Sequence, residues 1–413
     1  MGIATEMPAD PYSIDLTELD PADPMLYQKQ YHWAYFKRLR EEDPVHFVEG
    51  GVFGPYWAIT RFKDIMFVDT HHDLFSSYPS IAIGEPQTDF QPPMFIAMDP
   101  PRHDDQRKVV QPAVAPQRLA DMETLIRSRV VEVLDSLPIG EPFNWVNKVS
   151  IELTTRMLAT LFDFPFEDRS KLTYWSDVAT SGPGVGGNLP EEERAAILME
   201  CLEYFNRLWK ERSEAPAKSD FISLLSHDPA TQNMPPMEYL GNLILLIVGG
   251  NDTTRNSMSG SVLALHRYPG QFAKLKADKS LIPGMVSEVI RWQTPLAHMR
   301  RKATADVELG GKLIRKGERV VMWYISGNRD EEAIDRPDEF IIDRENPRNH
   351  ISFGFGIHRC MGNRLAEMQL RVLWEEILQR FERVEVVGEP ERVHSNFVMG
   401  YSDLPVILHP LVN

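Results

Sequence analysis

The sequence contains few cysteines and no apolar run long enough to cross a membrane. Only two of its 413 residues are cysteines, Cys201 and Cys360, which excludes a disulfide framework and favours a reducing compartment. The longest clearly apolar run, 243–248, is far shorter than the ~20 residues of a membrane span. Residues 1–6 show no secretory pattern, and Glu6 stands where a myristoylation pattern has Ser or Thr. We therefore expect a cytoplasmic protein without a membrane anchor.

The sequence also lacks linkers, repeats and an excess of positive charge. It has no Gly/Ser tract and no long block of one charge, so nothing divides it into several domains. Residues 1–26, rich in Pro and Asp, are expected to form an extended N-terminal segment, and 27–413 a single domain that acts as a monomer. The 60 acidic and 44 basic residues give a net charge of −16, which disfavours nucleic acid and anionic membranes as partners.

Apolar residues that recur every three or four positions predict helices along most of the chain. The predicted helices cover 27–42, 62–68, 122–137, 146–162, 190–212 (with Cys201 as core filler), 237–266 and 285–292, and two more begin at about 100 and after Cys360. Strands are predicted at 45–48 and 56–60, as a hairpin, at 295–301, and among 384–412. Residues 76–100, rich in Pro, Gly and apolar side chains, form either a wall of a pocket or a well-packed loop. Residues 181–187, with four glycines, are expected to be flexible.

The stretch 353–360 carries the chemistry around which the chain is organised. Cys360 directly precedes a helix, and the free N–H groups of a helix N-terminus lower the pKa of a thiol and favour the thiolate, a strong soft ligand. Gly354 and Gly356 permit positive φ and the close approach of a flat partner, against which Phe353 can pack. The residues alone leave three other interpretations open: a buried structural cysteine, a zinc site with His358, or a cysteine nucleophile paired with His358.

The pattern F-x-x-G-x-H-x-C over 353–360, followed by a helix, resembles the cysteine-ligand loop of the haem-thiolate monooxygenases, the cytochromes P450. The resemblance extends from about Tyr27 to the end of the chain, with four motifs in the family's order. It implies a mainly α fold with a small β-rich region, a b-type haem held without covalent bonds, and Cys360 as the iron ligand. Phe353 and Gly362 are implied as further cofactor contacts, and the helices joined near 181–187 as a mobile cover of the pocket.

The middle of the predicted helix 237–266 is poor in helix formers. Residues 249–254, Gly-Gly-Asn-Asp-Thr-Thr, either break the helix, with Asp252 or Thr253 capping a second one, or widen a turn so that a ligand approaches the backbone. They resemble the family's A/G-G-x-D-T-T segment, which favours the second interpretation. The resemblance implies that Gly249 borders the oxygen-binding groove, that Thr253 hydrogen-bonds the oxygen, and that Asp252 brings in protons.

Glu288 and Arg291, three residues apart on a helix, form an ion pair that is weak evidence alone. They match the family's E-x-x-R, which implies that they lock the cysteine-ligand region. The third, basic member of that network is replaced here by Glu339, and either Arg336 or Arg344 is expected to substitute for it.

Four basic residues are implied as ligands of the haem propionates. His103 and Arg107 lie four apart on one helical face, where they can hold one anionic group together. The resemblance adds His358 and, from the spacing to the following Ala-Thr-Ala-Asp-Val, Arg301, with Arg300 as the alternative. Judged from the residues alone, the pair His103 and Arg107 and the two arginines Arg300 and Arg301 also fit a solvated surface.

Five apolar residues are expected to contact the substrate: Ile83, Leu245, Val248, Leu296 and Phe397. An apolar pocket suits an aliphatic chain. The segments 93–101 and 248–257 resemble those of bacterial terminal hydroxylases of alkanes and medium-chain fatty acids, which implies ω-hydroxylation of linear chains. A terpene or a steroid would suit the same residues.

The sequence contains no flavin or iron–sulfur motif, so electrons must come from other proteins. The resemblance to soluble bacterial relatives implies an NAD(P)H-dependent reductase and a small ferredoxin as partners, with O2 as co-substrate. We expect them to dock on the Cys360 side, at a basic patch of Arg102, Lys108, Arg359 and Arg364. Two functions of other classes stay open: a haem-thiolate sensor or carrier, against which Asp252 and Thr253 argue, and a hydrolase that uses Cys360 without haem.

Overall fold

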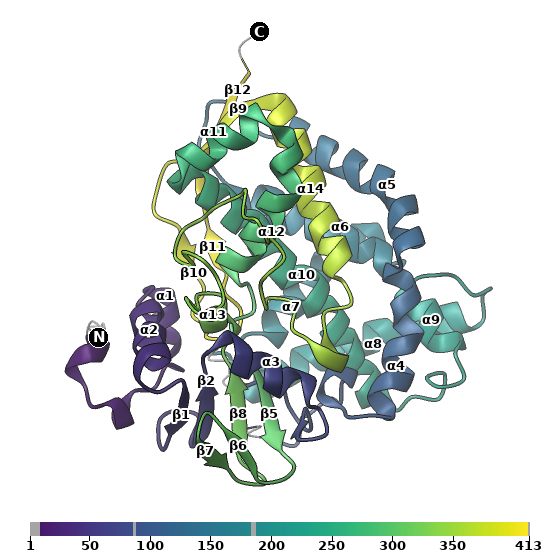
Figure 1. The fold of residues 1–413 in the computed structure, drawn as a ribbon. Helices are drawn as coiled ribbons and strands as arrows, with labels where there is room; N and C mark the ends of the chain where they lie inside the picture. The colour runs from purple at the N-terminus through teal and green to yellow at the C-terminus, as the bar shows by residue number, and fades with distance from the viewer. Residues whose placement is uncertain (1–8, 86–87, 183–186, 412–413) are drawn as a thin grey trace, which may run out of the picture.

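The computed structural model describes residues 9–85, 88–182 and 187–411. The first eight residues of the expected N-terminal segment and most of the glycine-rich connection 181–187 lie outside this part of the chain. Helices dominate the structure, and a small five-stranded sheet lies at one side of them (Figure 1). The predicted mainly α fold with a small β-rich region is confirmed.

The central helix is α10 (Pro236–Arg267), and neighbouring helices surround it. It packs against α6 (Glu152–Leu161), α7 (Ser170–Ala179) and α12 (Ile282–Gln293). The helix runs without interruption through 249–254, so the interpretation of that segment as a chain break is wrong. Packing on several sides outweighs the cost of about 1 kcal/mol that each glycine adds to a helix interior.

The helix that follows Cys360 is α14 (Asn363–Arg380), which packs against α12 and α5 (Pro116–Asp135). Its residues Leu370, Leu373 and Ile377 are buried in the same large hydrophobic cluster as most of the apolar residues of α10. This agrees with the apolar face predicted from their spacing.

Eight further helices surround these elements within the described ranges. They are α1 (Pro24–Gln28), α2 (His32–Glu42), α3 (Phe62–Thr70), α4 (Arg102–Val110), α8 (Glu191–Ser213), α9 (Phe221–His227), α11 (Pro269–Ala277) and α13 (Tyr324–Gly327). The predicted helix 27–42 is divided into α1 and α2, because Gln30 has a positive φ of 64°. The predicted helix 146–162 begins as a π-helical turn, Val146–Ile151. Cys201 is fully buried in α8, as expected for a core filler, and burial raises the pKa of its thiol well above the usual value.

The five-stranded sheet has the order β1-β2-β8-β5-β3. Its strands are β1 (Val45–Val48), β2 (Tyr56–Ile59), β8 (Arg319–Met322), β5 (Met299–Ala303) and β3 (Phe75–Ser76). β2 and β8 are parallel, and the other neighbours are antiparallel. The predicted hairpin is confirmed, with Val45 opposite Ile59.

Three smaller sheets complete the strands of the described chain. They pair β4 (Phe143–Asn144) and β9 (Phe381–Val386) with β12 (Pro405–Pro410), β10 (Glu391–Arg392) with β11 (Tyr401–Asp403), and β6 (Val307–Leu309) with β7 (Lys312–Ile314).

Residues 9–26 differ from the extended conformation that their composition predicts. They form two short 3-10 turns, Pro11–Ser13 and Leu16–Glu18, and then enter α1. Leu19 and Leu26 are buried in a second hydrophobic cluster, together with residues of the sheet. The apolar residues between the Pro and Asp positions therefore dock this segment onto the body of the protein.

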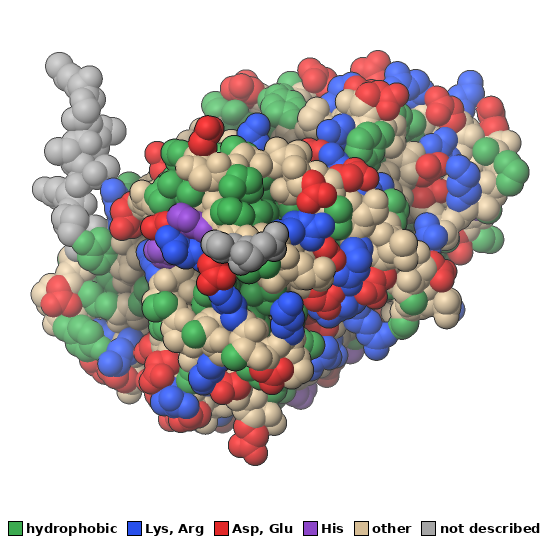
Figure 2. Space-filling model, turned by 90° about the horizontal axis from the view of Figure 1, so that it is seen from above, with side chains coloured by type: hydrophobic (Ala, Val, Ile, Leu, Met, Phe, Trp, Pro, Cys, Tyr) green, Lys and Arg blue, Asp and Glu red, His purple; other side chains and the backbone are tan. Residues whose placement is uncertain are grey.

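On the face seen in Figure 2, acidic and basic side chains are interspersed, with small groups of hydrophobic ones between them. Ion pairs also join exposed side chains of the protein: Lys274 lies 2.9 Å from Asp343, and Arg383 lies 3.2 Å from Glu385. Despite the net charge of −16, this face therefore carries no continuous acidic surface. Within the described residues, no helix is both long and apolar enough to span a membrane.

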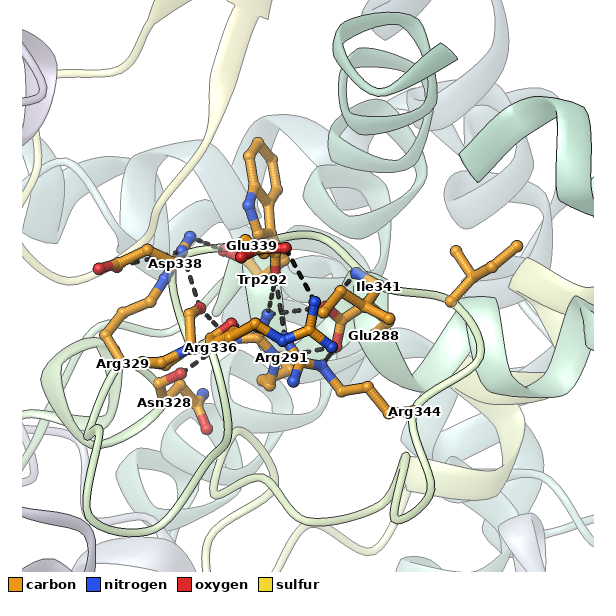
Figure 3. Close-up of polar contacts among 12 residues, drawn as sticks. Glu288, Arg291, Trp292, Asn328, Arg329, Arg336, Asp338, Glu339, Ile341 and Arg344 are labelled. Carbon is orange, nitrogen blue, oxygen red and sulfur yellow. Dashed lines mark hydrogen bonds and ion pairs between the residues drawn. The ribbon is translucent and has the colours of Figure 1, made fainter. Parts of the chain in front are cut away.

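Glu288 and Arg291 of α12 form the centre of a buried polar network (Figure 3). Arg291 donates two hydrogen bonds to the Glu288 carboxylate, at 2.8 and 2.7 Å. Arg344 Nε donates to the same carboxylate at 2.9 Å. Arg336 is exposed and bonds instead to the side chains of Asp335 and Glu339. Of the two substitutes that the sequence left open, Arg344 is the third member of the network.

The network fastens α12 to the chain that leads into the Cys360 loop. Arg291 also donates to the carbonyl oxygens of Asn328, Pro337 and Glu339. The Asn328 side chain accepts a hydrogen bond from the Ile351 N–H and donates one to Ser352 Oγ, both at 2.8 Å. The ion pair therefore fixes the residues directly before Phe353.

The two candidate arginines give a matched test of this network. We expect Arg344→Gln to lower the free energy of unfolding by about 2 kcal/mol, because it removes a charge-assisted hydrogen bond from a buried carboxylate. Arg336→Gln, at an exposed position, should change it by no more than about 0.5 kcal/mol. Denaturant unfolding measures both, and equal losses would contradict the assignment of Arg344.

Candidate active site

The Cys360 loop has the backbone geometry that its glycines predict. Gly354 and Gly356 have φ of 64° and 65°. A Cβ on Gly356 would lie 2.4 Å from the backbone oxygen of Asp69 in α3, so a side chain is excluded there. The Cys360 N–H donates to the carbonyl oxygen of Phe353 at 2.8 Å and closes the loop.

Asp69 of α3 fixes this loop by hydrogen bonds, a role that the sequence did not predict. Its buried carboxylate accepts hydrogen bonds from the N–H of Phe355 at 2.7 Å and from the hydroxyl of Tyr324 at 3.1 Å, and it pairs with Arg301 at 2.9 Å. Burial raises the pKa of Asp69, while the charge of Arg301 lowers it. An aspartate in an ordinary amphipathic helix carries no sequence signal of such contacts.

The protonation of Cys360 differs from the prediction. Although the residue as a whole is exposed, enough protein surrounds its sulfur that desolvation raises the pKa of the thiol above its usual value. The N–H groups of Gly362 and Asn363 and the charges of Arg107 and Arg359 lower that pKa, as the helix-terminus argument predicts. Desolvation is the largest of these effects, so the pKa of the thiol is raised and the predicted net lowering is wrong.

The four predicted basic residues come together beside this loop. The rings of His103 and His358 lie edge to face, with centroids 4.3 Å apart. Arg107 donates a hydrogen bond to the backbone oxygen of Arg359. Burial, together with the charges of Arg301, His103 and Arg107, lowers the pKa of His358 to about 2. His358 is therefore neutral near pH 7, and Arg107 and Arg301 carry the positive charge of the cluster.

Two ring nitrogens of this basic cluster are unpaired. His103 Nε2 and His358 Nδ1 are buried and have no hydrogen-bond partner in the described part of the chain, whereas His103 Nδ1 donates a hydrogen bond to the Asp104 carboxylate at 2.7 Å. An unpaired buried polar atom costs free energy, and the positive charge of Arg107 beside it favours an anion. Arg301 is different, because its guanidinium is already paired with Asp69. Together with a single cysteine sulfur at a helix start, these polar groups fit a haem, which offers an iron atom and two carboxylates.

Arg300, the alternative to Arg301, points to the other side of strand β5, as alternate residues of a strand do. It is buried and donates to the Gly84 carbonyl oxygen at 3.1 Å and to the Glu85 carboxylate at 2.8 Å. The structure therefore brings Arg301, not Arg300, into the basic cluster.

Ser77 and Asp99 support the cluster and were also missed. Ser77 Oγ lies 2.8 Å from His358 Nε2, which leaves Nδ1 of that ring as the free atom. The Asp99 carboxylate accepts a hydrogen bond from the Ser77 N–H at 3.0 Å. Ser and Asp are common in loops, so only the tertiary structure identifies these two.

The other interpretations of Cys360 find little support. No group of three or more His, Cys, Asp and Glu side chains in the described residues is arranged to hold a metal ion, as zinc would require. No hydrogen bond joins Cys360 to His358 in the same residues: Nε2 of His358 bonds Ser77, and Nδ1 has no partner.

α10 presents one open stripe in an otherwise buried helix. Between Glu238 and Leu265 the residues that are not buried are Leu245, Val248, Gly249, Gly250 and Thr253. Gly250 packs against Leu158 of α6, and the other four share a face by their spacing. A Cβ on Gly249 would meet no atom within 4 Å. The stripe therefore combines predicted substrate, oxygen and hydroxyl residues.

Asp252 lies beside this stripe but is fully buried. Its carboxylate lies 2.8 Å from Arg255 Nη2, and the same Nη2 lies 2.6 Å from the half-exposed carboxylate of Asp177 on α7. Burial raises the pKa of Asp252 to about 6, against the charge of Arg255, which lowers it. Thr253 donates to the Gly249 carbonyl oxygen at 3.1 Å. A carboxyl group that titrates near neutral pH can both take up and release protons.

The remaining predicted substrate residues lie in two places. Leu296 is half-buried and pairs with Val398 through an isolated β-bridge, next to Phe397. Phe397 is buried, with its ring 5.2 Å from that of His298. Ile83 has no exposed surface and belongs to the second hydrophobic cluster, so in this conformation it is a core residue.

The expected basic patch loses one member. Arg102 Nη2 lies 2.5 Å from the Glu238 carboxylate of α10. This ion pair offsets the positive charge of Arg102, so Arg102 adds little to a basic patch. Lys108, Arg359 and Arg364 are exposed and form no ion pair within the described chain.

Comparisons with known proteins agree with this geometry. A family model described as Cytochrome P450 matches residues 106–403. The chain is 49% identical to the solved structure of CYP153D17 from Sphingomonas sp., covering 95% of this chain and all of that one, with a TM-score of 0.90. It is 35% identical to a linalool 8-monooxygenase of Pseudomonas putida (95% of this chain, 99% of the relative) and 32% identical to a methyl-branched lipid omega-hydroxylase of Mycobacterium tuberculosis (90% of each). The chain belongs to the cytochrome P450 family of haem-thiolate monooxygenases.

Proposed function

We propose that this cytochrome P450 hydroxylates the terminal carbon of linear aliphatic substrates, medium-chain alkanes or fatty acids. The observation that carries the proposal is the open stripe of α10, which offers Leu245 and Val248 to a substrate beside Gly249 and Thr253. An apolar surface next to a hydroxyl group suits a substrate without polar groups at its reacting end. A relative that acts on the ω position of a lipid supports the same class.

In this proposal the basic cluster and Cys360 hold the cofactor. Cys360 provides the thiolate, the N–H groups of Gly362 and Asn363 stabilise its charge, and Phe353 and the glycines of the loop shape one side of the site. His103, Arg107 and His358 bind the two carboxylates, and Arg301 adds positive charge while Asp69 fixes it. When bound, the haem supplies the activation of O2 that oxidises a C–H bond. The chain's own task is to orient it and to exclude water.

Asp252 and Thr253 manage the protons of the reaction. The Asp252 carboxyl has a pKa of about 6, so it exchanges protons readily near neutral pH. Arg255 holds it on the side of α7, where Asp177 is half-exposed to solvent. Thr253 offers its hydroxyl on the open stripe, where it can pass a proton on. A proton thus enters from the α7 side and leaves at the stripe.

Two alternatives have specific support. A relative that acts on linalool favours a terpene substrate, which the apolar residues also suit. A haem-thiolate sensor or carrier would keep Cys360 but has no use for a buried carboxyl that titrates near neutral pH. Electrons come from an NAD(P)H-dependent reductase and a ferredoxin, which dock on Lys108, Arg359 and Arg364 at the Cys360 side of the protein.

The two cysteines provide a matched test of the cofactor site. We expect the dithionite-reduced protein to give the carbon monoxide difference spectrum of a haem thiolate. Cys360→Ala should abolish that spectrum, because it removes the sulfur ligand, whereas Cys201→Ala should keep it, since Cys201 only fills the core of α8. An unchanged spectrum in Cys360→Ala would contradict the site.

The substrate is tested by product analysis. With reductase, ferredoxin and NAD(P)H, we expect octane and lauric acid to give mainly the terminal alcohol, because the apolar stripe binds the chain end. Linalool serves as the competing substrate. Turnover of linalool alone, or products oxidised mainly in mid-chain, would refute terminal hydroxylation, and the lack of any turnover would favour the sensor.

The surroundings of Asp252 predict two shifts of opposite sign. Arg255→Gln should raise its pKa by about one unit, because a positive charge next to the carboxylate is lost. Asp177→Asn should lower it, because a like charge is lost. The infrared band of the protonated carboxyl group, assigned with Asp252→Asn, measures both against the wild-type value of about 6. Shifts of the same sign would contradict the arrangement in which Arg255 pairs with both Asp252 and Asp177.

A further inference from the structure

The open stripe of α10 ends at a buried asparagine on each side. Asn242 precedes Gly249 by seven residues, and Asn256 follows it by seven. Seven residues are close to two helical turns, so both asparagines lie on the face of Gly249. Each accepts a hydrogen bond from the backbone of another segment: Asn242 from the N–H of Phe95 at 2.9 Å, Asn256 from the N–H of Tyr401 at 3.2 Å. Chain segments therefore cover this face at both ends and leave it open between them.

The amide of Asn242 is oriented by α4. Its Nδ2 donates to Gln106 Oε1 at 2.8 Å, and Gln106 in turn donates to the Glu238 carboxylate. With the NH2 group engaged on this side, Oδ1 is left to accept from Phe95. Asn242 has no exposed surface, so the bond to Phe95 is shielded from water.

Gly241 brings the same segment into direct contact with α10. A Cβ at this position would lie 2.0 Å from the carbonyl oxygen of Pro93. Only glycine allows the backbone at 92–93 to approach the helix so closely. Gly241 and Asn242 thus fasten residues 93–95 to α10 by two independent means, one steric and one by hydrogen bonding.

The fastened segment stands at the end of the stripe. Asn242 is one turn before Leu245, the first open residue, and Thr253 lies eleven residues after Asn242, or about 16 Å along the axis. Phe95 is buried in the large hydrophobic cluster, at whose edge Leu245 and Val248 lie. Residues 93–95 therefore form a wall across one end of the apolar surface.

We propose that Asn242 is a specificity-determining positioning residue: it fixes residues 93–95 as the end wall that limits how far a substrate extends along α10 from Thr253. The inference rests on the proposed function, since it concerns the substrate of that same site. A fixed wall keeps the terminal carbon of a linear chain at the reacting position, whereas a loose wall lets the chain slide and exposes the next carbons.

Two variants loosen the wall in different ways. Asn242→Leu removes the acceptor of the Phe95 N–H, and Gly241→Ala places a methyl group where the Pro93 carbonyl lies. Gly270→Ala is the matched control, because Gly270 in α11 has open space around its Cβ position. If Asn242→Leu does not fold, Gly241→Ala provides the test.

The first measurement is hydrogen–deuterium exchange of a peptide that covers residues 93–98, which needs neither substrate nor turnover. We expect at least roughly tenfold faster exchange of the Phe95 N–H in both variants and no change in Gly270→Ala. Unchanged exchange in both would show that Asn242 does not hold the segment and would overturn the inference.

The second measurement is the ratio of terminal to subterminal alcohol formed from octane. We expect this ratio to fall roughly three- to tenfold in both variants, because the loss of one hydrogen bond or close contact weakens the preference for the terminal carbon. In the control the ratio should stay unchanged. Faster exchange with an unchanged ratio would overturn the role in specificity while the proposed function stands. A wild type that oxidises linalool but no linear chain would overturn the proposed function, and the ratio of linalool products then tests the wall in the same variants.

Discussion

The structure depends on the burial of α10, a 32-residue helix whose interior carries many polar side chains. A buried polar group must find a partner, and in α10 the partners come from the surrounding helices. Thr154 of α6 donates to Asn251 at 2.8 Å, and Ser150 bonds Ser259 at 2.9 Å. These bonds specify how α6 and the π-helical turn before it lie against α10. Apolar packing alone would leave their register less defined.

The same requirement orders the cofactor site. The basic cluster concentrates positive charge where there is little water, although the protein as a whole is acidic. Asp69 offsets part of this charge and at the same time fixes the glycine-rich loop, so one carboxylate connects α3, β5 and the residues before Cys360. In the proposed function, His103 and His358, whose buried ring nitrogens stay unpaired, hold an anionic ligand. The Asp69 carboxylate therefore determines both the geometry of the loop and part of the charge distribution of the site.

The parts of the site that follow from local rules could be predicted from the sequence, and the parts that depend on distant residues could not. Positive φ at Gly354 and Gly356 follows from local sequence, whereas the continuity of α10 through 249–254 depends on packing against the surrounding helices. The choice of Arg344 over Arg336 depends on which one reaches Glu288 across the fold. α7 was missed because its Ser, Thr, Tyr and Trp residues are poor helix formers, and contacts with α10 and α8 stabilise it. The pKa of Cys360 was misjudged because a local effect, the helix terminus, is smaller than desolvation by the whole fold.

The two adjacent glycines of α10 illustrate how packing within the chain and binding from outside it can be separated. Packing within the chain accounts for Gly250, since a Cβ there would lie 2.7 Å from a side-chain carbon of Leu158, which would have to move. Gly249 has no such neighbour, and an alanine would fit and would strengthen the helix by about 1 kcal/mol. In the proposed function, a group that approaches the stripe from outside the chain accounts for this glycine. The position of Gly249, between Leu245 and Thr253 on the open face, is where the bound cofactor and oxygen would need that space.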